Sequence, residues 1–394
     1  MPANAQTPAG SLTEGGPDPT KVHVRIGALW VNPSISLTNL GVDTNVFNDP
    51  PEQSPKDDFT LTVVPAVDLW LGIGRTWLTG SVRETVTWYQ TYSSERSATG
   101  AYTVGWKVPL NRLFVDVGLA YARPKDRPGY EIDTRAERQE LGYRGSVEIR
   151  ALSKTYFGVR ASRKSIDYAS GDTYNGVNLE QSLNLVTTEF AGTVRHQLTP
   201  LTSLSFAASR SEDRFEFSPE RDSNSNIVAA TVNFDPYAII KGSATIGYRD
   251  FQPLSAGLES YEGFVALANL VYVLRGSTRF EFKALHDIFY SYDVTQPYYL
   301  ETGLDGSVAQ QIYGPLDAIV RGGLHHLAYR DQAGAGVEFF DRVDTIKLYG
   351  GGLGYHLGDN SRLGFDIDKV SRDSELADHR YEGLRYGMSF TYNF

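Results

Sequence analysis

Apolar and polar residues alternate with a period of two through almost the whole chain, and no other feature limits its fold more. In the segment 141–149, Leu141 and Val147 share one face, while Arg144 and Glu148 lie on the other. The same pattern recurs up to the C-terminus. Because successive side chains of a strand point to opposite faces, such segments predict β-strands with one apolar and one polar face.

Segment length and connection length distinguish a membrane barrel from a soluble sandwich. Many segments run for roughly 10 to 15 residues, whereas ordinary strands have ~5 to 6 and a tilted membrane strand needs about 9 to 11. The connections alternate between short and long. The short ones are 74–76, 109–111, 152–154, 199–201, 275–277, 313–315 and 358–360, and the long ones are 44–58, 93–99, 124–137, 168–178, 217–226, 251–260, 291–297, 331–341 and 373–380. Short periplasmic turns and longer extracellular loops are typical of outer-membrane barrels.

We therefore expect an all-β fold, a transmembrane antiparallel up-and-down β-barrel of about 18 strands with both termini on the periplasmic side. The turn within 235–242 is the least clear, and the segment 264–274, apolar on both faces, fits either register. No apolar run approaches the ~18 residues of a membrane-spanning helix. A closed barrel is then the remaining way to cross a membrane, because it leaves no backbone group unpaired.

Composition agrees with this fold and excludes several kinds of site. The chain has 24 Tyr, 19 Phe and 38 Gly, which suits aromatic girdles and tight turns. It has no Cys, which excludes disulfides, thiolate metal sites and a Cys nucleophile. The net charge of -10 argues against a nucleic-acid partner. We expect no cofactor and no metal, and we expect outer-membrane lipid and lipopolysaccharide around the barrel.

The N-terminal residues carry a sign of processing. Ala3-Asn4-Ala5 matches the small-residue pattern that ends a secretory signal peptide, although a chance alanine-rich tail is the alternative. Residues 6–20 are rich in Gly, Pro, Thr and Asp. We expect residues 1–27 to form a flexible periplasmic tail, a remnant of the cleavage region, and residues 28–394 to form the barrel.

The last segment alternates and ends on an aromatic residue. One face carries the apolar series, and Arg385, Gly387 and Ser389 begin the other. The segment resembles the C-terminal β-signal that outer-membrane proteins present to the barrel-assembly machinery, although an ordinary half-buried strand would look similar. We predict an insertion signal formed by Tyr386, Met388, Phe390, Tyr392 and Phe394.

Three short motifs resemble a known family. They are Asn-Pro-Ser-Ile-Ser-Leu at 32–37, Gly-Val-Asp-Thr-Asn-Val-Phe at 41–47, and Gly-Tyr-Arg-Asp-Phe at 247–251. The first two resemble the first strand and loop of a family of outer-membrane β-barrel porins often found in exopolysaccharide biosynthesis and export loci, and the third resembles a strand end of that family. The similarity in character runs from about Trp30 to Phe394. It implies a wide barrel that assists polysaccharide secretion, or a porin-like channel, and it supplies no catalytic residues.

The sequence offers no clear catalytic group, so we expect no enzymatic activity. The strongest candidate is His325-His326, in the expected strand 317–330. Neighbouring residues of a strand face opposite ways, so these two histidines cannot serve one site. We expect one to be a polar lumen residue and the other an aromatic near the membrane interface.

Two other motifs have simpler explanations than ligand binding. The spacing of Asp222, Asn224 and Asn226 is not that of an EF-hand, so solvated loop residues are expected. No helix follows Gly350-Gly351-Gly352 to form a phosphate site. These glycines more readily mark a strand bend or a place where a large side chain is not accommodated.

The polar face of the barrel is the candidate functional site. A charge on the lipid face costs about 2 to 4 kcal/mol near the midplane, so the charged residues of these segments should face inward. Glu84 shares the face of its segment with apolar Leu78 and Val82, so either the register slips there or Glu84 sits near an edge. The residues predicted to line the pore are Arg144, Glu148, Arg160, Glu189, Arg279, Glu281, Lys283, Asp305, Arg321, Lys347, Asp366, Asp368 and Arg385.

A lumen of mixed charge favours a wet, weakly selective path. The first functional hypothesis is an outer-membrane channel of a Gram-negative bacterium that assists exopolysaccharide export, with polysaccharide and periplasmic export proteins as partners. The alternatives are a general or sugar-selective diffusion porin, and a barrel enzyme or structural anchor for a surface polymer.

Overall fold

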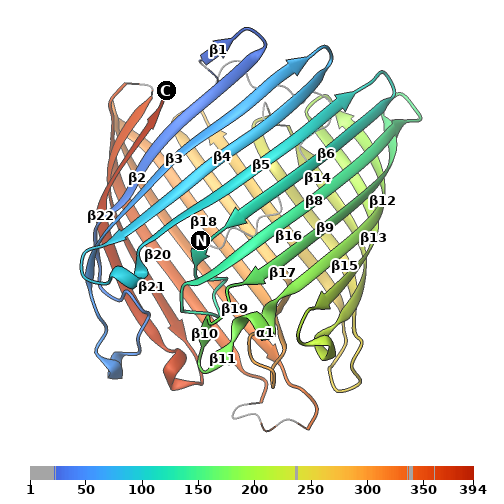
Figure 1. The fold of residues 1–394 in the computed structure, drawn as a ribbon. Coiled ribbons are helices and arrows are strands. Elements are labelled where there is room, and N and C mark those ends of the chain that lie inside the picture. Colours follow the sequence, from blue (N-terminus) through green and yellow to red (C-terminus); the bar gives the residue numbers. More distant parts are fainter. Residues whose placement is uncertain (1–21, 23, 236–237, 335, 337–339, 359) are drawn as a thin grey trace.

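In the computed structural model, eighteen strands form one closed antiparallel β-barrel (Figure 1). The structure describes residues 22, 24–235, 238–334, 336, 340–358 and 360–394. The barrel strands are β2 (Leu29–Asp43), β3 (Asp58–Ile73), β4 (Thr76–Tyr89), β5 (Ser97–Pro109), β6 (Leu113–Arg123), β8 (Ala136–Arg150), β9 (Thr155–Tyr168), β12 (Leu185–Thr199), β13 (Thr202–Phe215), β14 (Ser223–Phe234), β15 (Ile240–Pro253), β16 (Tyr261–Leu274), β17 (Thr278–Tyr290), β18 (Tyr298–Tyr313), β19 (Leu316–Arg330), β20 (Val343–His356), β21 (Ser361–Asp373) and β22 (Tyr381–Asn393).

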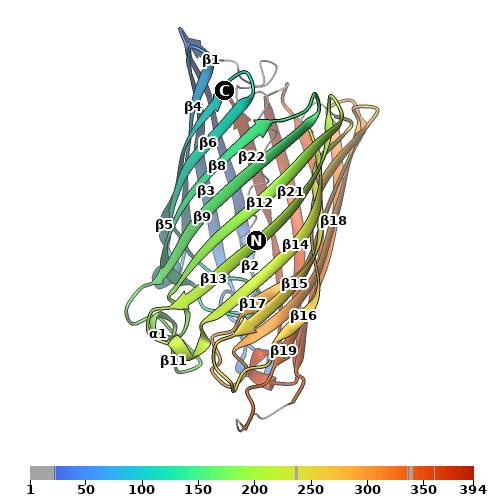
Figure 2. The ribbon, with the colours of Figure 1, turned by 90° about the vertical axis from the view of Figure 1, so that its right-hand side faces the viewer.

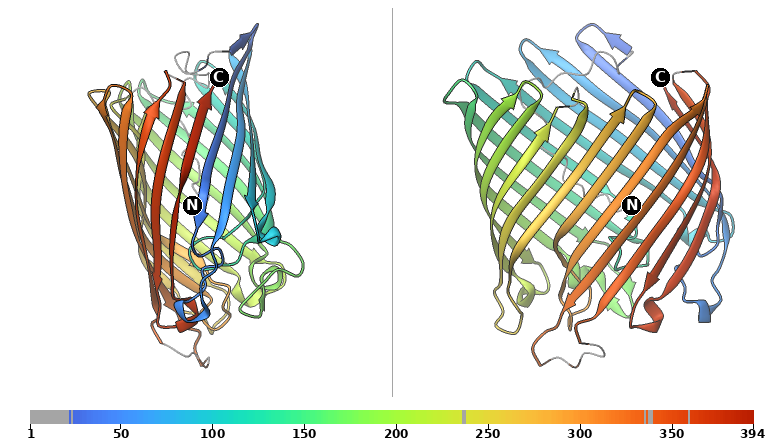
Figure 3. Two further views of the ribbon diagram at one scale, coloured as in Figure 1. Left: turned by 90° about the vertical axis from the view of Figure 1, so that its left-hand side faces the viewer. Right: turned by 180° about the vertical axis from the view of Figure 1, so that it is seen from behind.

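Each barrel strand pairs with the next one along the chain, and the last pairs with the first. β22 runs antiparallel to β2, with Asn393 opposite Ser34 and Arg385 opposite Asp43. This pairing removes both sheet edges, as a membrane requires. The strands are tilted relative to the barrel axis, as Figure 1, Figure 2 and the right-hand view of Figure 3 show. The predicted fold class and strand number are confirmed.

The two ends of the barrel differ. Short turns and the C-terminus lie at the upper end in Figure 1, where β1 (Val24–Ile26) extends the β2 hairpin. Long loops fill the lower end, which is the extracellular end for a barrel of this kind. These loops carry the short elements η1 (Pro51–Gln53), η2 (Ser93–Glu95), β7 (Lys125–Asp126), β10 (Thr173–Tyr174), β11 (Val177–Asn178), α1 (Leu179–Leu183), η3 (Pro219–Arg221) and η4 (Ala377–His379).

Several loop boundaries differ from the sequence prediction. β5 already begins at Ser97 and β14 at Ser223, so these strands reach further into the loop end than predicted. The loop predicted to end at residue 178 continues to residue 184. The reason is that the Asn178 side chain accepts a hydrogen bond from the backbone N–H of Gln181 and caps helix α1. In the turn predicted as least clear, residues 236–237 lie outside the described residues, as do residues 1–21 and 23 of the predicted tail.

The alternation gives the barrel wall an apolar outer face and a polar inner face. Phe190, Val228 and Val320 are exposed on the outer face at 64%, 65% and 67%. In the segment with two apolar faces, Phe264 faces outward at 56% exposure and Val265 is buried on the inner side. The exposed apolar band fits contact with lipid acyl chains, since the same surface in water would favour aggregation.

Candidate channel lumen

Most of the charged residues predicted to line the pore lie on the inner face of the wall. On β19, for example, Arg321 alternates with Val320, which is exposed on the outer face. The same phase holds for Arg144 and Glu148 on β8, Arg160 on β9, Glu189 on β12, Arg279, Glu281 and Lys283 on β17, Asp305 on β18, Asp366 and Asp368 on β21, and Arg385 on β22.

Lys347 is the exception, and its predicted inward position is wrong. It shares the outer face of β20 with Tyr349 and Leu353, which are 59% and 63% exposed. Its ammonium pairs with Asp373 of β21 at 2.7 Å on that face. The cause lies in Gly350-Gly351-Gly352, which carry no side chains, so the local pattern of β20 does not reveal which phase is apolar.

Glu84 faces outward without any slip in register. The β3–β4 pairing is interrupted at Glu84 but keeps the same register on both sides, and the β4–β5 ladder is continuous, with Glu84 opposite Gly100. The Tyr102 hydroxyl donates a hydrogen bond to its carboxylate. A Cβ on Gly100 would meet the Tyr102 ring, so this glycine makes room for the ring to reach Glu84. The carboxylate is thus a hydrogen-bonded exception in an apolar surface.

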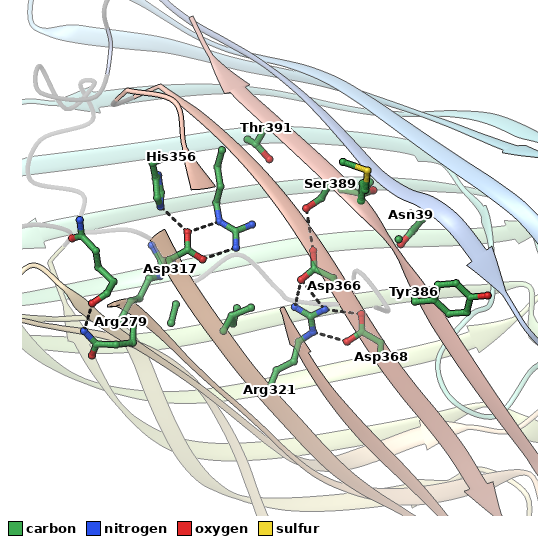
Figure 4. A pocket seen from close by; sticks show the side chains of 18 of the residues that line it. Asn39, Arg279, Asp317, Arg321, His356, Asp366, Asp368, Tyr386, Ser389 and Thr391 are labelled. Atoms are coloured by element: carbon green, nitrogen blue, oxygen red, sulfur yellow. Dashed lines mark hydrogen bonds and ion pairs between the residues drawn. The ribbon is translucent and has the colours of Figure 1, made fainter. Parts of the chain in front are cut away.

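Arginine–carboxylate bridges cover the inner face near the short-turn end (Figure 4). The guanidinium of Arg321 donates from Nε and Nη2 to the two oxygens of Asp368, each at 2.6 Å, and from Nη1 to Asp366 at 3.2 Å. Beside it, Arg362 donates to both oxygens of Asp317 at 2.8 and 2.6 Å. Two-pronged pairs of this kind fix geometry as well as charge.

Glycines on the intervening strand allow these bridges to form. Arg321 of β19 and Asp368 of β21 both lie opposite Gly350 of β20. A Cβ at Gly350 would overlap the Asp368 carboxylate and come within 2.8 Å of Arg321 Nε. Gly352 makes room for Asp366 in the same way. The expectation that this glycine run marks a place without room for side chains is confirmed at these two positions.

Paired charges also cover the opposite part of the wall. Arg195 of β12 bridges to Glu148 of β8 at 2.6 Å across β9, where Glu148 lies opposite Gly158 and Arg195 opposite Tyr156. Arg160 pairs with Glu189 at 3.0 Å. The partners that the sequence prediction missed share the inward phase of their strands, so the period-two pattern could have found them. They are Asp43, Asp116, Arg195, Asp317 and Arg362.

A cavity of about 940 Å³ opens between these bridges and extends from the short turns at Gly276 and Gly358 to Thr60 and Arg385, near the loop ends of their strands. Arg279, Arg321 and Arg385 line it together with Asp317 and Asp366. Hydroxyl and amide side chains fill the spaces between the charges, among them Asn39, Thr60, Thr278, Gln310, Ser389 and Thr391. The cavity wall therefore offers hydrogen-bond donors and acceptors side by side.

A loop segment crosses the lumen at the extracellular end. This segment, residues 127–135, is called the strap. It connects β7 to β8, yet its Asp133 accepts a hydrogen bond at 2.9 Å from Arg372 of β21, on the far wall of the barrel. The ring of Tyr130 packs 4.3 Å from that of His325 of β19. Closer to its own side, Arg127 donates to the Val46 carbonyl at 2.7 Å.

The centre of the strap is fully buried by other extracellular loops. Glu131 accepts hydrogen bonds from the Ser291 hydroxyl at 2.5 Å and from the Tyr292 backbone N–H at 3.2 Å. Burial raises the pKa of Glu131 to about 7, although these hydrogen bonds and the guanidinium of Arg372 favour its charged form. Ile132 packs into an apolar cluster with Ala136, Tyr168, Leu179, Leu183 and Tyr292.

His379 of η4 belongs to the same buried group. Its ring nitrogens lie 2.9 Å from Asn175 Nδ2 and 3.1 Å from Arg372 Nη2. Burial and the neighbouring guanidinium groups of Arg372 and Arg342 lower the pKa of His379 to about 4. Burial thus raises the pKa of Glu131 in the strap and lowers the pKa of His379, which contacts Arg372, a partner of the strap.

The two adjacent histidines separate as predicted. His325 faces the lumen, 3.0 Å from Glu301 and 3.3 Å from Asp305. His326 faces the other way and lies 3.0 Å from the Thr345 hydroxyl. The prediction that they face opposite sides is confirmed, and the acidic partners of His325 hold it in the wall.

Other predicted features also have defined places. Asn224 and Asn226, expected in a loop, lie instead within β14, because this strand begins at Ser223. Within the described ranges, no group of three His, Cys, Asp or Glu could hold a metal ion. The same part of the chain contains no helix long and apolar enough to cross a membrane.

Solved outer-membrane structures match the chain over most of its length. Outer membrane protein OpdK from Pseudomonas aeruginosa is 11% identical, with a TM-score of 0.48 over 92% of this chain and 98% of that chain. OccAB4 from Acinetobacter baumannii is 10% identical, with a TM-score of 0.46 over 96% and 100%. A bacterial polysaccharide outer membrane secretin is 11% identical, with a TM-score of 0.33 over 92% and 98%. No curated protein sequence matches the chain.

A family model accounts for nearly the whole sequence. The family is described as "Putative beta-barrel porin 2", and its model matches residues 18–394, which include every strand of the barrel. The match and the apolar outer face agree on a porin-like channel in the outer membrane of a Gram-negative bacterium. The chain belongs to this family of β-barrel porins.

Proposed function

We propose that this porin-like channel carries a polyhydroxylated polymer, an exopolysaccharide, out of the cell. Barrels of 16 to 18 strands are wide enough to enclose an aqueous channel. The cavity gives such a polymer a polar path that begins at the periplasmic turns, and the loops at the other end control its exit. We propose no catalytic step, because the charged groups of the wall bind one another.

The observation that carries this proposal is the pairing of charges along the lumen wall. Arg321 with Asp368, Arg362 with Asp317, and Arg195 with Glu148 neutralise one another locally. A wall of this kind presents many hydrogen-bonding groups and little net field. It suits sugar hydroxyls, which donate and accept hydrogen bonds, better than it suits a small ion of either sign.

Hydroxyl pairs on the inner face support the same substrate class. Ser81 and Thr103 lie 2.6 Å apart on β4 and β5, and Thr231 and Thr245 lie 2.8 Å apart on β14 and β15. These neutral pairs continue the donor and acceptor surface between the charged bridges. Weak, repeated contacts let a chain bind and leave each position, which conduction requires.

A sugar-selective diffusion porin is the second candidate, and the strap favours it. In the structure, residues 127–135 cross the lumen and contact the far wall through Asp133 and Tyr130. A small saccharide needs less displacement of the strap than a polymer does. The two candidates therefore differ in whether the strap must leave the lumen during transport.

A deletion strain distinguishes these functions. We expect that loss of the protein reduces secreted polysaccharide, and that the wild-type gene restores it. Purified barrel in a planar lipid bilayer should also conduct ions. Normal secretion with a stable conductance would favour the diffusion porin. Normal secretion without conductance would leave a structural anchor or an enzyme, and polymer export would be wrong.

A further inference from the structure

The five tryptophans of the chain divide into two groups. Trp88 and Trp106 face outward, at 37% and 51% exposure, near opposite ends of the wall. They fit the aromatic girdles that anchor a barrel at the two membrane interfaces. Trp30, Trp70 and Trp77 face the lumen instead, so anchoring to lipid does not explain them.

The inward direction follows from the strand register. Trp70 has the same phase on β3 as Thr60 and Thr62, which are buried on the inner side. Trp30 of β2 lies directly opposite Trp70. Trp77 of β4 lies opposite Gly72, two positions along β3 from Trp70 on the same face.

The three indoles therefore occupy neighbouring positions on the same face of adjacent strands, and we call them the indole platform. Residues directly or diagonally opposite on one face lie close enough for aromatic side chains to form one surface. The ring of Trp77 extends over Gly72, where an added Cβ would lie 3.3 Å from its outer carbons. Gly72 thus keeps the surface flat beside Trp70.

The platform stands at the periplasmic mouth. The turn at Gly74-Arg75 joins β3 to β4 only a few residues from Trp70 and Trp77. These hairpins rise at the short-turn end of the barrel (Figure 3). All three indoles are partly exposed, and none of them packs against another aromatic ring within the described residues.

Polar groups surround the platform on the same face. Asp68 lies two residues before Trp70 and is paired in register with Asn32 and Ser81. Lys107 lies opposite Trp77. The guanidinium of Arg25 stacks 4.8 Å from the centre of the Trp30 ring. Flat apolar surfaces edged by donors and acceptors match a pyranose ring, which has a C–H face and a rim of hydroxyls.

We propose that Trp30, Trp70 and Trp77 form a saccharide-binding site that receives the sugar chain at the periplasmic entrance. The site lies before the bridged cavity on the path into the barrel. The proposal rests on a saccharide being the transported solute, but it does not depend on the direction of transport or on the length of the chain.

Calorimetric titration of the purified full-length barrel with neutral hexasaccharides, maltohexaose and cellohexaose, tests the site. Trp70→Ala and Trp77→Ala should each weaken binding about tenfold, the effect of losing one stacking contact. Trp70→Phe keeps a stacking ring and should lose much less. Trp106→Ala, which removes an outward indole, is the matched control and should bind like wild type.

Heat-modifiable migration on gels verifies that each variant forms a barrel. Equal affinities for Trp70→Ala, Trp77→Ala and Trp106→Ala would overturn the proposal, as would the absence of hexasaccharide binding to the wild type. Platform-dependent binding together with normal polymer secretion in the deletion strain would support the site and contradict export. Impaired secretion in that strain with no effect of the platform variants would contradict the site alone.

Discussion

Asp133 in the strap accepts a hydrogen bond at 2.9 Å from Arg372 on the opposite wall of the barrel. Arg372 also donates to the Glu131 carbonyl at 2.8 Å and to Asp344 at 2.6 Å, and it is almost fully buried. One guanidinium thus joins a loop to the wall across the lumen. Passage of a large solute would require the strap to leave this position, so we propose that the strap is the gate of the channel.

Replacing Gly350 by Ala should destabilise the barrel. The added Cβ would overlap Asp368 and displace the Arg321 bridge, and overpacking of this kind costs about 1 to 3 kcal/mol. Gly192→Ala is the matched control, because nothing lies within 4 Å of its Cβ position. The measurement is urea unfolding in detergent. Equal midpoints for both variants would contradict the role assigned to Gly350.

Breaking opposite sides of two bridges should shift ion selectivity in opposite directions. Arg321→Gln leaves Asp366 and Asp368 without their guanidinium, so the channel should become more cation-selective. Asp317→Asn releases Arg362 and should make it more anion-selective. Reversal potentials in a KCl gradient measure both. Arg210→Gln, on the outer face of β13, should leave the potential unchanged. Shifts of the same sign would refute the pairing argument.

Deleting Phe394 should reduce insertion of the barrel into the outer membrane. β22 closes the barrel against β2, and Phe394 follows it with its ring 4.7 Å from that of Tyr392. The comparison is Phe217→Asp, which alters an exposed aromatic in a loop. Quantitative blots of outer-membrane fractions give the result. If both variants reach wild-type levels, the terminal residues are no insertion signal.

Docking of the strap should respond to pH in opposite ways when Glu131 or His379 is removed. The pKa of Glu131 is raised to about 7, so its contribution to docking is present below about pH 4.5 and lost as pH rises through 7. The pKa of His379 is lowered to about 4, so its contribution is present above about pH 6.5 and lost as pH falls through 4. In the wild type, as pH falls from 6.5 to 4.5, Glu131 favours docking of the strap more and His379 favours it less, so the two effects oppose each other.

The variants separate these contributions. The burial that raises the pKa of Asp133 gives an effect of the same sign as that of Glu131, and Asp133 is present in both variants. Glu131→Gln removes the Glu131 effect, so as pH falls from 6.5 to 4.5 channel opening should rise relative to the wild type. His379→Gln leaves only the effects of Glu131 and Asp133, so opening should decrease over that range. Bilayer conductance as a function of pH measures the slopes, and slopes that change from the wild type in the same direction would contradict the assignment.

The alternating pattern predicted the barrel well, because the apolar and polar residues within each strand show which face is outer and which is inner. The bulky apolar residues beside Arg321 and Asp366 show directly which face of each strand is the outer one. Lys347 was misplaced because the glycines that follow it give no such signal. The strap could not be predicted, since the Asp133–Arg372 contact joins residues 239 positions apart and depends on loop packing. The indole platform could have been predicted from the sequence, because the residues beside Trp30, Trp70 and Trp77 show that each indole lies on the inner face of its strand.

The most direct test of the gate replaces residues 128–133 by a Gly-Ser linker of equal length and measures single-channel conductance. The linker lacks Tyr130, Glu131 and Asp133, which contact the far wall and the neighbouring loops. A matching replacement of residues 255–258, in another extracellular loop, is the control. We expect a severalfold larger conductance for the strap variant and wild-type conductance for the control. Equal conductance of wild type and strap variant, or no conductance from either, would contradict a channel gated by the strap.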